Sequence, residues 1–161
     1  MADREALLAD LDAARDAFHD VLAEVDAELA TVPGVMEDWS VRDIVFHLAA
    51  WSEHAAEALA LATAGRGDEF AYSTGDTNAM NERFLAEGRD VSPVLALRRE
   101  EAAFAAFRAA VVTVDPALLD LKLGNGDTVA EVVVYDGPEH YAEHSAHLRV
   151  WFGAEGEGDE D

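Results

Sequence analysis

The sequence has no cysteine among its 161 residues. This absence excludes thiolate nucleophiles, iron–sulfur clusters, cysteine-based zinc sites and disulfides. A metal ion held by this chain therefore needs His, Asp or Glu ligands. A chain without disulfides also fits a reducing compartment.

Basic residues are scarce as well. The chain has 11 Lys and Arg against 34 Asp and Glu, which gives a formal net charge of −23, and Lys122 is the only lysine. Proteins that bind nucleic acid use basic side chains to displace counterions from phosphates, so this charge predicts no nucleic-acid binding. The same argument disfavours an anionic membrane surface.

Two explanations of the acidity stay open. A high-GC genome enriches Arg over Lys, together with Ala, Gly, Asp and Glu. A salt-loving host favours an acidic surface that stays hydrated in concentrated salt. We favour adaptation to salt, because codon bias alone seldom drives a small domain to this charge.

Long apolar runs are also missing. No uninterrupted stretch approaches the ~20 residues that span a bilayer, and the charged start of the chain has no apolar signal segment. We therefore expect a cytoplasmic protein. The length suits one domain, and the 50% hydrophobic content argues against disorder despite the charge.

Apolar residues recur at helical spacing along most of the chain. We expect Ser40 and Ser92 to cap helices, with Asp43 completing the first cap. Pro138 predicts a kink or a fresh helix start. The pattern predicts long helices over about residues 4–31, 41–64, 93–112 and 139–152, and a short helix over 77–87.

Residues 128–135 are ambiguous. Their valines suit a strand, whereas a cap at Asp127 and the helical context favour a helix. Four long helices with moderate connections describe an all-α four-helix bundle, with the short helix between the second and third long ones. We expect one domain over residues 1–152 and a disordered acidic tail over 153–161.

Five of the six histidines fall in two of these helices. His140 and His144 stand at i and i+4, so both imidazoles lie on one helix face and can bind the same ion. His47 lies in an apolar stretch, where an unsatisfied imidazole is costly, and is the best candidate for a third ligand. Three protein ligands with an open position are typical of a catalytic metal site.

Each histidine also has a simpler interpretation. An H-x3-H pair often arises by chance, and His47 could be a core histidine bonded to a carbonyl. We expect His54 at the rim or surface and His19 in solvent. His147 lies two turns from His140, too far to share one ion easily.

Other polar residues could join the site. Asp76, Asn78 and Asn81 lie where the loop and short helix could fold over the bundle end, although Asn78 is better explained as a turn or cap residue. Glu143 points about 100° away from His144, so we expect it to be solvated. The tryptophans are expected to pack between helices or to cap the bundle.

Three stretches resemble the DinB-like superfamily of small four-helix bundles. Residues 38–51 (DWSVRDIVFHLAAW) resemble its second-helix signature, and residues 139–148 (EHYAEHSAHL) resemble its final-helix H-x3-H signature. Residues 76–81 (DTNAMN) are similar to its D-x-N segment. The resemblance spans about residues 4–152, with the motifs in the right order.

The resemblance implies an up-down-down-up bundle with a histidine triad for a divalent metal ion, often zinc or nickel. By position the triad maps to His47, His140 and His144. Relatives include metal-dependent thiol transferases, mycothiol-dependent maleylpyruvate isomerases and a colibactin self-resistance hydrolase. The chain departs from the pattern at Gly137-Pro138, which precedes the final motif, and its third bundle helix has no recognisable thiol-cofactor signature.

The leading hypothesis is a metal-dependent hydrolase or thiol transferase that acts on a small molecule, a low-molecular-weight thiol among the candidates. The absence of cysteine means that a reactive thiol has to come from outside the chain. One alternative is a non-catalytic stress-response bundle that binds a ligand or metal. Another is a structural role with a homodimeric surface. The sequence assigns no catalytic side chain.

Overall fold

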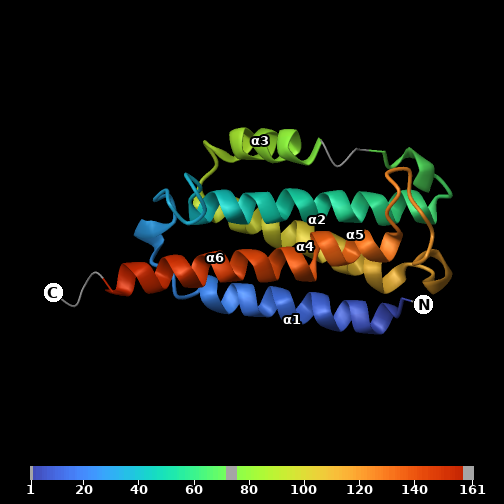
Figure 1. The fold of residues 1–161 in the computed structure, drawn as a ribbon, viewed down its shortest axis with the longest axis horizontal. Coiled ribbons are helices and arrows are strands. Elements are labelled where there is room, and N and C mark those ends of the chain that lie inside the picture. The colour runs from blue at the N-terminus through green and yellow to red at the C-terminus, as the bar shows by residue number, and fades with distance from the viewer. Residues whose placement is uncertain (1, 72–75, 158–161) are drawn as a thin grey trace.

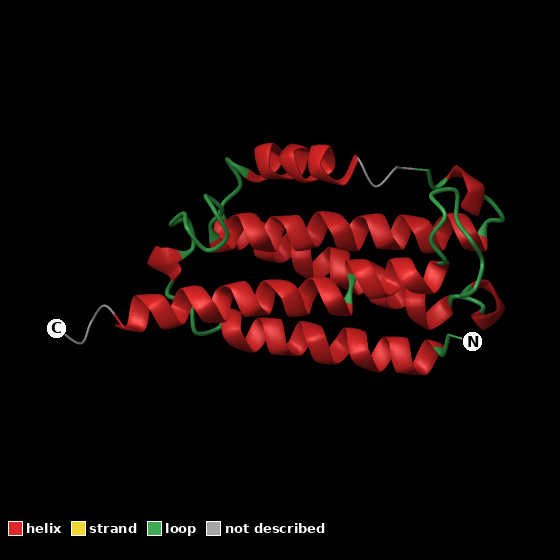
Figure 2. Cartoon of the chain, in the orientation of Figure 1, coloured by secondary structure: helices red, strands yellow, loops and turns green. Residues whose placement is uncertain are grey.

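The computed structural model describes residues 2–71 and 76–157. Its regular structure is helical, with no β-strand in these residues (Figure 2). The all-α class is thus confirmed, and the ambiguous segment 128–135 is helical from Val129 onward. The helices are α1 (Arg4–Leu22), α2 (Val41–Thr63), α3 (Asp76–Gly88), α4 (Pro93–Thr113), α5 (Val129–Asp136) and α6 (Pro138–Glu157), with 3₁₀ turns at Ala27–Leu29, Gly67–Glu69 and Pro116–Leu118.

The long helices lie nearly parallel along one axis (Figure 1). α2 packs most extensively against α4, and α1 packs against α6. α1 and the α5–α6 pair run toward one end of the molecule, whereas α2 and α4 run toward the other. α3 lies on the outer side of α2 and belongs to the connection between α2 and α4.

The first helix ends earlier than its apolar pattern predicts. α1 stops at Leu22, and the chain tightens there because the N–H groups of Glu24 and Val25 bond three residues back. Val25 and Leu29 still pack against the core from the following turns. The apolar spacing up to residue 31 therefore reported packing, not the length of the helix.

The helix starts at Ser40 and Ser92 are confirmed. The Asp43 N–H donates to Ser40 Oγ, and Asp43 Oδ2 accepts from the Ser40 N–H at 2.9 Å, which completes a capping box. Ser92 caps α4 with Pro93 in its first turn. Such caps each contribute about 1 kcal/mol and fix where α2 begins, hence which of its residues face inward.

The last long helical segment of the bundle is divided into two helices, α5 and α6. Thr128, not Asp127, caps α5, and it forms a capping box with Glu131. α5 ends at Asp136 and is followed by Gly137, where a Cβ would lie 2.5 Å from the Val133 carbonyl oxygen, so only glycine fits. Pro138 then starts α6.

The end of α6 also differs from the prediction. The helix continues to Glu157, past the expected end at residue 152. The last four residues of the predicted acidic tail lie outside the described residues, and the domain boundary at 152 stays a prediction. Within the described part of the chain, no helix is long and apolar enough to cross a membrane.

The core contains one carboxylate that the sequence analysis missed. The side chain of Glu100 is completely buried, and it accepts two hydrogen bonds from Arg15 and one of 2.6 Å from the Tyr141 hydroxyl. His19 Nε2 lies 3.1 Å from it, so His19 is not simply solvated. Burial alone would raise the pKa of Glu100, but hydrogen bonds from His19, Arg15 and Tyr141 lower this pKa to about 2. This polar cluster ties α1, α4 and α6 together.

Candidate metal centre

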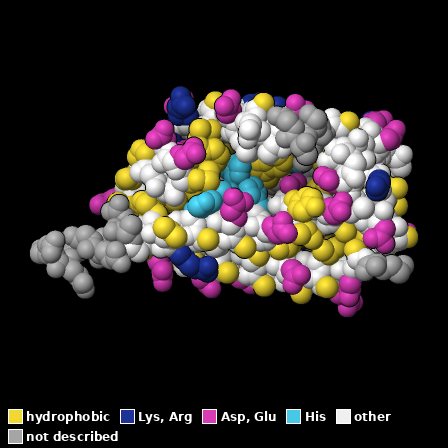
Figure 3. All heavy atoms as spheres, in the orientation of Figure 1, with side chains coloured by type: hydrophobic (Ala, Val, Ile, Leu, Met, Phe, Trp, Pro, Cys, Tyr) yellow, Lys and Arg dark blue, Asp and Glu magenta, His cyan; other side chains and the backbone are white. Residues whose placement is uncertain are grey.

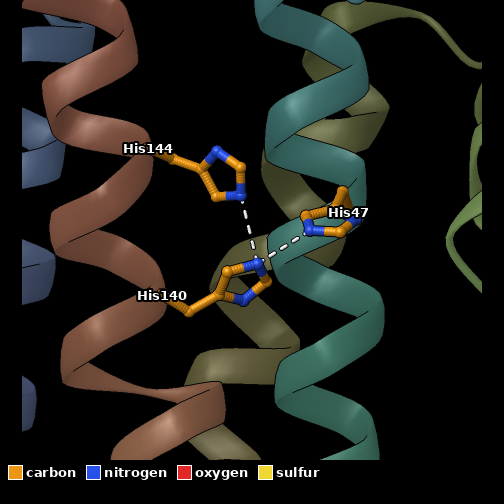
Figure 4. A group of neighbouring side chains, drawn as sticks. All are labelled: His47, His140 and His144. Carbon is orange, nitrogen blue, oxygen red and sulfur yellow. Dashed lines mark hydrogen bonds between the residues drawn. The ribbon is translucent and has the colours of Figure 1, made fainter. Parts of the chain in front are cut away.

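Three histidines predicted as ligands converge between α2 and α6 (Figure 4). His47 lies on α2, and His140 and His144 lie one turn apart on α6. His140 Nε2 is 2.7 Å from His47 Nε2 and 3.1 Å from His144 Nε2. One potential ligand atom from each residue lies within 4.8 Å of the others. The α2 capping box and the α5–α6 break set the positions of these side chains along the two helices.

His47 and His144 are buried and His140 is partly buried, and all three imidazoles are uncharged at neutral pH. Burial, with a smaller contribution from the neighbouring His144, lowers the pKa of His47 to about 3. Burial and the adjacent His140 and His147 lower the pKa of His144 to about 2, and burial holds the pKa of His140 well below its usual value. Neutral imidazoles keep the lone pairs that a metal ion needs.

Hydrogen bonds among the three rings cannot give each of the three Nε2 atoms a partner. A neutral imidazole nitrogen carries either one proton or one lone pair, yet His140 Nε2 faces both His47 Nε2 and His144 Nε2. In either role, His140 Nε2 leaves one neighbour without a well-directed partner. A cation among the three nitrogens would accept a lone pair from each. Three histidines are also a donor set that catalytic zinc sites use, so the residues present fit a metal ion.

The outer nitrogens of the cluster differ in their surroundings. His144 Nδ1 lies 3.2 Å from Nδ1 of His147, which is itself partly buried. His147 thus contacts a predicted ligand and does not join the triad. His47 Nδ1 is buried and has no hydrogen-bond partner within the described residues. Among the described residues, the outer nitrogen of His144 therefore has an imidazole neighbour, whereas the outer nitrogen of His47 has no hydrogen-bond partner.

A cavity of about 630 Å³ opens onto the histidines. In Figure 3 the histidine side chains lie at a hollow in the surface, with Asp and Glu side chains close by. The hollow is large enough for a small-molecule ligand. The cavity is lined by Met36, Trp39, His47, Trp51, Thr77, Asn81, Asp127, Tyr135, Asp136, His140, Glu143 and His144.

The other polar candidates from the sequence divide into two groups. Asn81 lines the cavity, and its Oδ1 accepts a 2.8 Å hydrogen bond from Trp51 Nε1. Asp76 and Asn78 are exposed and do not line the cavity. Glu143 is exposed as expected, but it also forms part of the cavity wall.

A titratable pair beside the cavity, of which Asp136 lines the wall, escaped the sequence analysis. His54 is not at the surface, because its side chain is only 10% exposed and its Nδ1 lies 3.2 Å from Asp136 Oδ2. Burial raises the pKa of Asp136, and the contact with His54 opposes this shift. One signal was available in the sequence: Asp136, His140 and His144 follow one another at four-residue intervals.

Fold and site together define a helical bundle with a largely buried three-histidine cluster that faces a cavity. Comparison with known families shows which family of helical bundles the chain belongs to. Residues 11–149 match the family described as the mycothiol maleylpyruvate isomerase N-terminal domain. The chain belongs to this family of the DinB-like superfamily, and the resemblance drawn from its motifs is confirmed. None of the curated proteins matches the sequence.

Solved structures share the fold at low sequence identity. An uncharacterised protein from Escherichia coli UTI89 superposes with a TM-score of 0.81 at 17% identity, over 95% of this chain and 94% of its own. The colibactin self-resistance protein ClbS, solved in complex with a dsDNA, gives 0.77 at 15% identity, over 91% and 93%. A mutant of the mycothiol-dependent maleylpyruvate isomerase gives 0.76 at 14% identity, over 91% of this chain and 61% of the isomerase. These likenesses establish the fold.

Proposed function

We propose that this protein binds a divalent metal ion, zinc or nickel, through His47, His140 and His144, and that it uses the ion to transfer a small thiol. The main support is the position of His140 Nε2, which faces two other imidazole nitrogens within 3.1 Å. A bound divalent ion supplies a Lewis acid, which lowers the pKa of a thiol or polarises a carbonyl group.

The side chains around the cavity have separate tasks in this proposal. The three imidazoles stay neutral because burial disfavours their protonated forms. Trp51, held by Asn81, forms a rigid apolar wall that orients a ligand and excludes water. The chain supplies no thiol of its own, since it has no cysteine. The names of the family and of the isomerase relative both contain mycothiol, which supports an external thiol.

The metal part of the proposal is tested on protein purified without a histidine tag. We expect close to one equivalent of zinc or nickel by elemental analysis, and loss of this metal in His144→Ala. His19→Gln is the matched control, because it removes an imidazole outside the cluster. Less than about a tenth of an equivalent, with no uptake of added zinc or nickel, would overturn the metal site.

The reaction is tested with metal-loaded protein and a set of electrophilic small molecules in the presence of thiols. We expect the rate of thiol consumption to exceed that of the metal-free protein and of His144→Ala. Turnover without thiol would assign hydrolysis instead of thiol transfer. Stoichiometric metal with no turnover in either assay would favour a bundle that binds its ligand without catalysis.

A further inference from the structure

The cavity over the histidines is acidic. Asp127, Asp136 and Glu143 contribute carboxylates to its wall, and none of its twelve described lining residues is Lys or Arg. A metal site for an anionic substrate commonly places a basic side chain opposite the anion. The described wall of this cavity has no such group.

The ion pairs of the arginines lie outside the cavity wall. Among the described residues these pairs include Arg15 with Glu100, Arg99 with Glu53 and Arg108 with Asp12, and no arginine of this part of the chain lines the cavity. Within the same residues, Asp127 and Glu143 form no salt bridge. No basic side chain in the described part of the protein is therefore paired with either carboxylate.

The carboxylates of the wall have different neighbours. Asp127 is partly buried and accepts a 3.1 Å hydrogen bond from the neutral amide of Asn125. Glu143 is exposed on α6, whereas Asp136 is engaged by His54. Asp127 and Glu143 are thus the carboxylates best suited to attract a charged part of a ligand.

Two indole rings complete the cavity. Trp39 lies edge-on to His47, with 5.0 Å between ring centroids, and Trp51 is also T-shaped to the same imidazole. Both tryptophans line the cavity beside the metal-binding atoms. Indole faces attract cations, so they act in the same direction as the carboxylates.

We propose that the ligand of this cavity is a small molecule that carries an ammonium group on the part pointing away from the metal-binding atoms. Carboxylates and indole faces favour that group over a carboxylate or phosphate in the same place. Asp127 and Glu143 then determine specificity. This inference rests on the proposed thiol-binding metal site and adds the charge of its ligand.

Three thiol probes with different tails test the charge preference on the protein loaded with Co²⁺. The probes are cysteamine with an ammonium tail, 2-mercaptoethanol with a neutral tail, and 3-mercaptopropionate with a carboxylate tail. Dissociation constants come from the thiolate-to-cobalt absorption band at low salt. Far-UV circular dichroism checks that each variant is folded.

The expected order of affinity follows the tail charge, with cysteamine about tenfold or more tighter than 3-mercaptopropionate. The thiols also differ in intrinsic acidity, so the decisive quantity is the change of this ratio between variants. Glu143→Gln and Asp127→Asn are each expected to lower the ratio about threefold or more. Glu139→Gln is the matched control, since Glu139 is an exposed glutamate of α6 that does not line the cavity.

An unchanged ratio in both Glu143→Gln and Asp127→Asn, or tighter binding of 3-mercaptopropionate, would overturn the charge preference while leaving the thiol site intact. The absence of a thiolate band with all three probes would overturn the proposed thiol function, and this inference with it. The two failures are therefore distinguishable, because the thiolate band remains in the first and is absent in the second.

Discussion

His47 Nε2 lies 2.7 Å from His140 Nε2, although 93 positions separate these residues in the chain. The contact joins α2 to α6 at the cavity. It also places the nitrogens of two uncharged imidazoles at hydrogen-bond distance, with His144 Nε2 3.1 Å from His140 Nε2. The proposed metal site depends on this convergence.

His147 is expected to strengthen metal binding without being a ligand. When His144 Nε2 gives its lone pair to a metal ion, Nδ1 carries the proton and needs an acceptor, and His147 Nδ1 lies 3.2 Å away. His147→Ala should therefore weaken zinc affinity about 10- to 100-fold in competition titrations with a chelator. Ser145→Ala is the control, because the buried Ser145 Oγ has no hydrogen-bond partner within the described residues. Equal affinities for the two variants would contradict the role of His147.

The metal-free protein is expected to lose stability as the pH falls below the ordinary histidine pKa. Burial lowers the folded-state pKa of His47 to about 3 and of His144 to about 2. The unfolded chain therefore takes up protons first, and the free energy of unfolding falls from about pH 6.5 downward. Glu100 adds to the loss only below about pH 4.5, because its pKa is lowered from an acidic value.

Chemical denaturation in the presence of a chelator, at pH values between 7 and 5, measures this dependence. His47→Ala should flatten the slope over that range, since it removes one buried imidazole and relieves its neighbours. Stability independent of pH between 7 and 5 in the native chain would contradict the buried, neutral histidines.

Glu100 is expected to be important for stability, because it accepts bonds from α1 and α6. Glu100→Gln removes the charge that pairs with Arg15 and weakens the contacts with His19 and Tyr141. We expect a loss of about 3 kcal/mol in the free energy of unfolding, measured with urea. Glu101→Gln is the control, because it makes the same substitution at an exposed neighbouring residue. It should lower the free energy of unfolding by less than about 0.5 kcal/mol. Similar losses in both variants would mean that the polar cluster contributes little.

The net charge of −23 gives a prediction that concerns the host's salt environment. If the acidity is an adaptation to salt, the thermal midpoint should rise steadily as potassium chloride increases toward molar concentrations, because counterions screen repulsion between the carboxylates. The measurement is a series of thermal unfolding curves. A midpoint that does not change with salt would favour the high-GC explanation.

Local sequence signals predicted most of the helices. Ser40 with Asp43, and Ser92 with Pro93, mark helix starts through contacts that span three residues or fewer, so they can be read directly. The end of α1 could not be read in this way, because Val25 and Leu29 remain in the core after the helix stops. Apolar spacing reports which residues are buried, and a turn can continue that spacing without a helix.

The candidate site also has features that the sequence predicted and features that it could not predict. His140 and His144 are neighbours on one helix, so their spacing alone indicated a shared metal ion. The apolar stretch around His47 made it the best candidate for a third ligand, and the family motifs agreed with that choice. The buried position of Glu100 and the pairing of His54 with Asp136 could not be inferred, because each depends on residues from helices distant in sequence. Solvated and buried carboxylates look alike in a sequence.

The sequence by itself determined the all-α class, the absence of a protein thiol and the candidate metal ligands His140 and His144, because composition, caps and i,i+4 spacing are local properties. The resemblance of its motifs indicated the family. Only the tertiary structure decided that three imidazole nitrogens meet, that His147 contacts the cluster from outside, and that an acidic cavity with two indole walls lies over them. The reason is physical: these features arise where α2 and α6 pack together, and the packing fixes which side chains share one space.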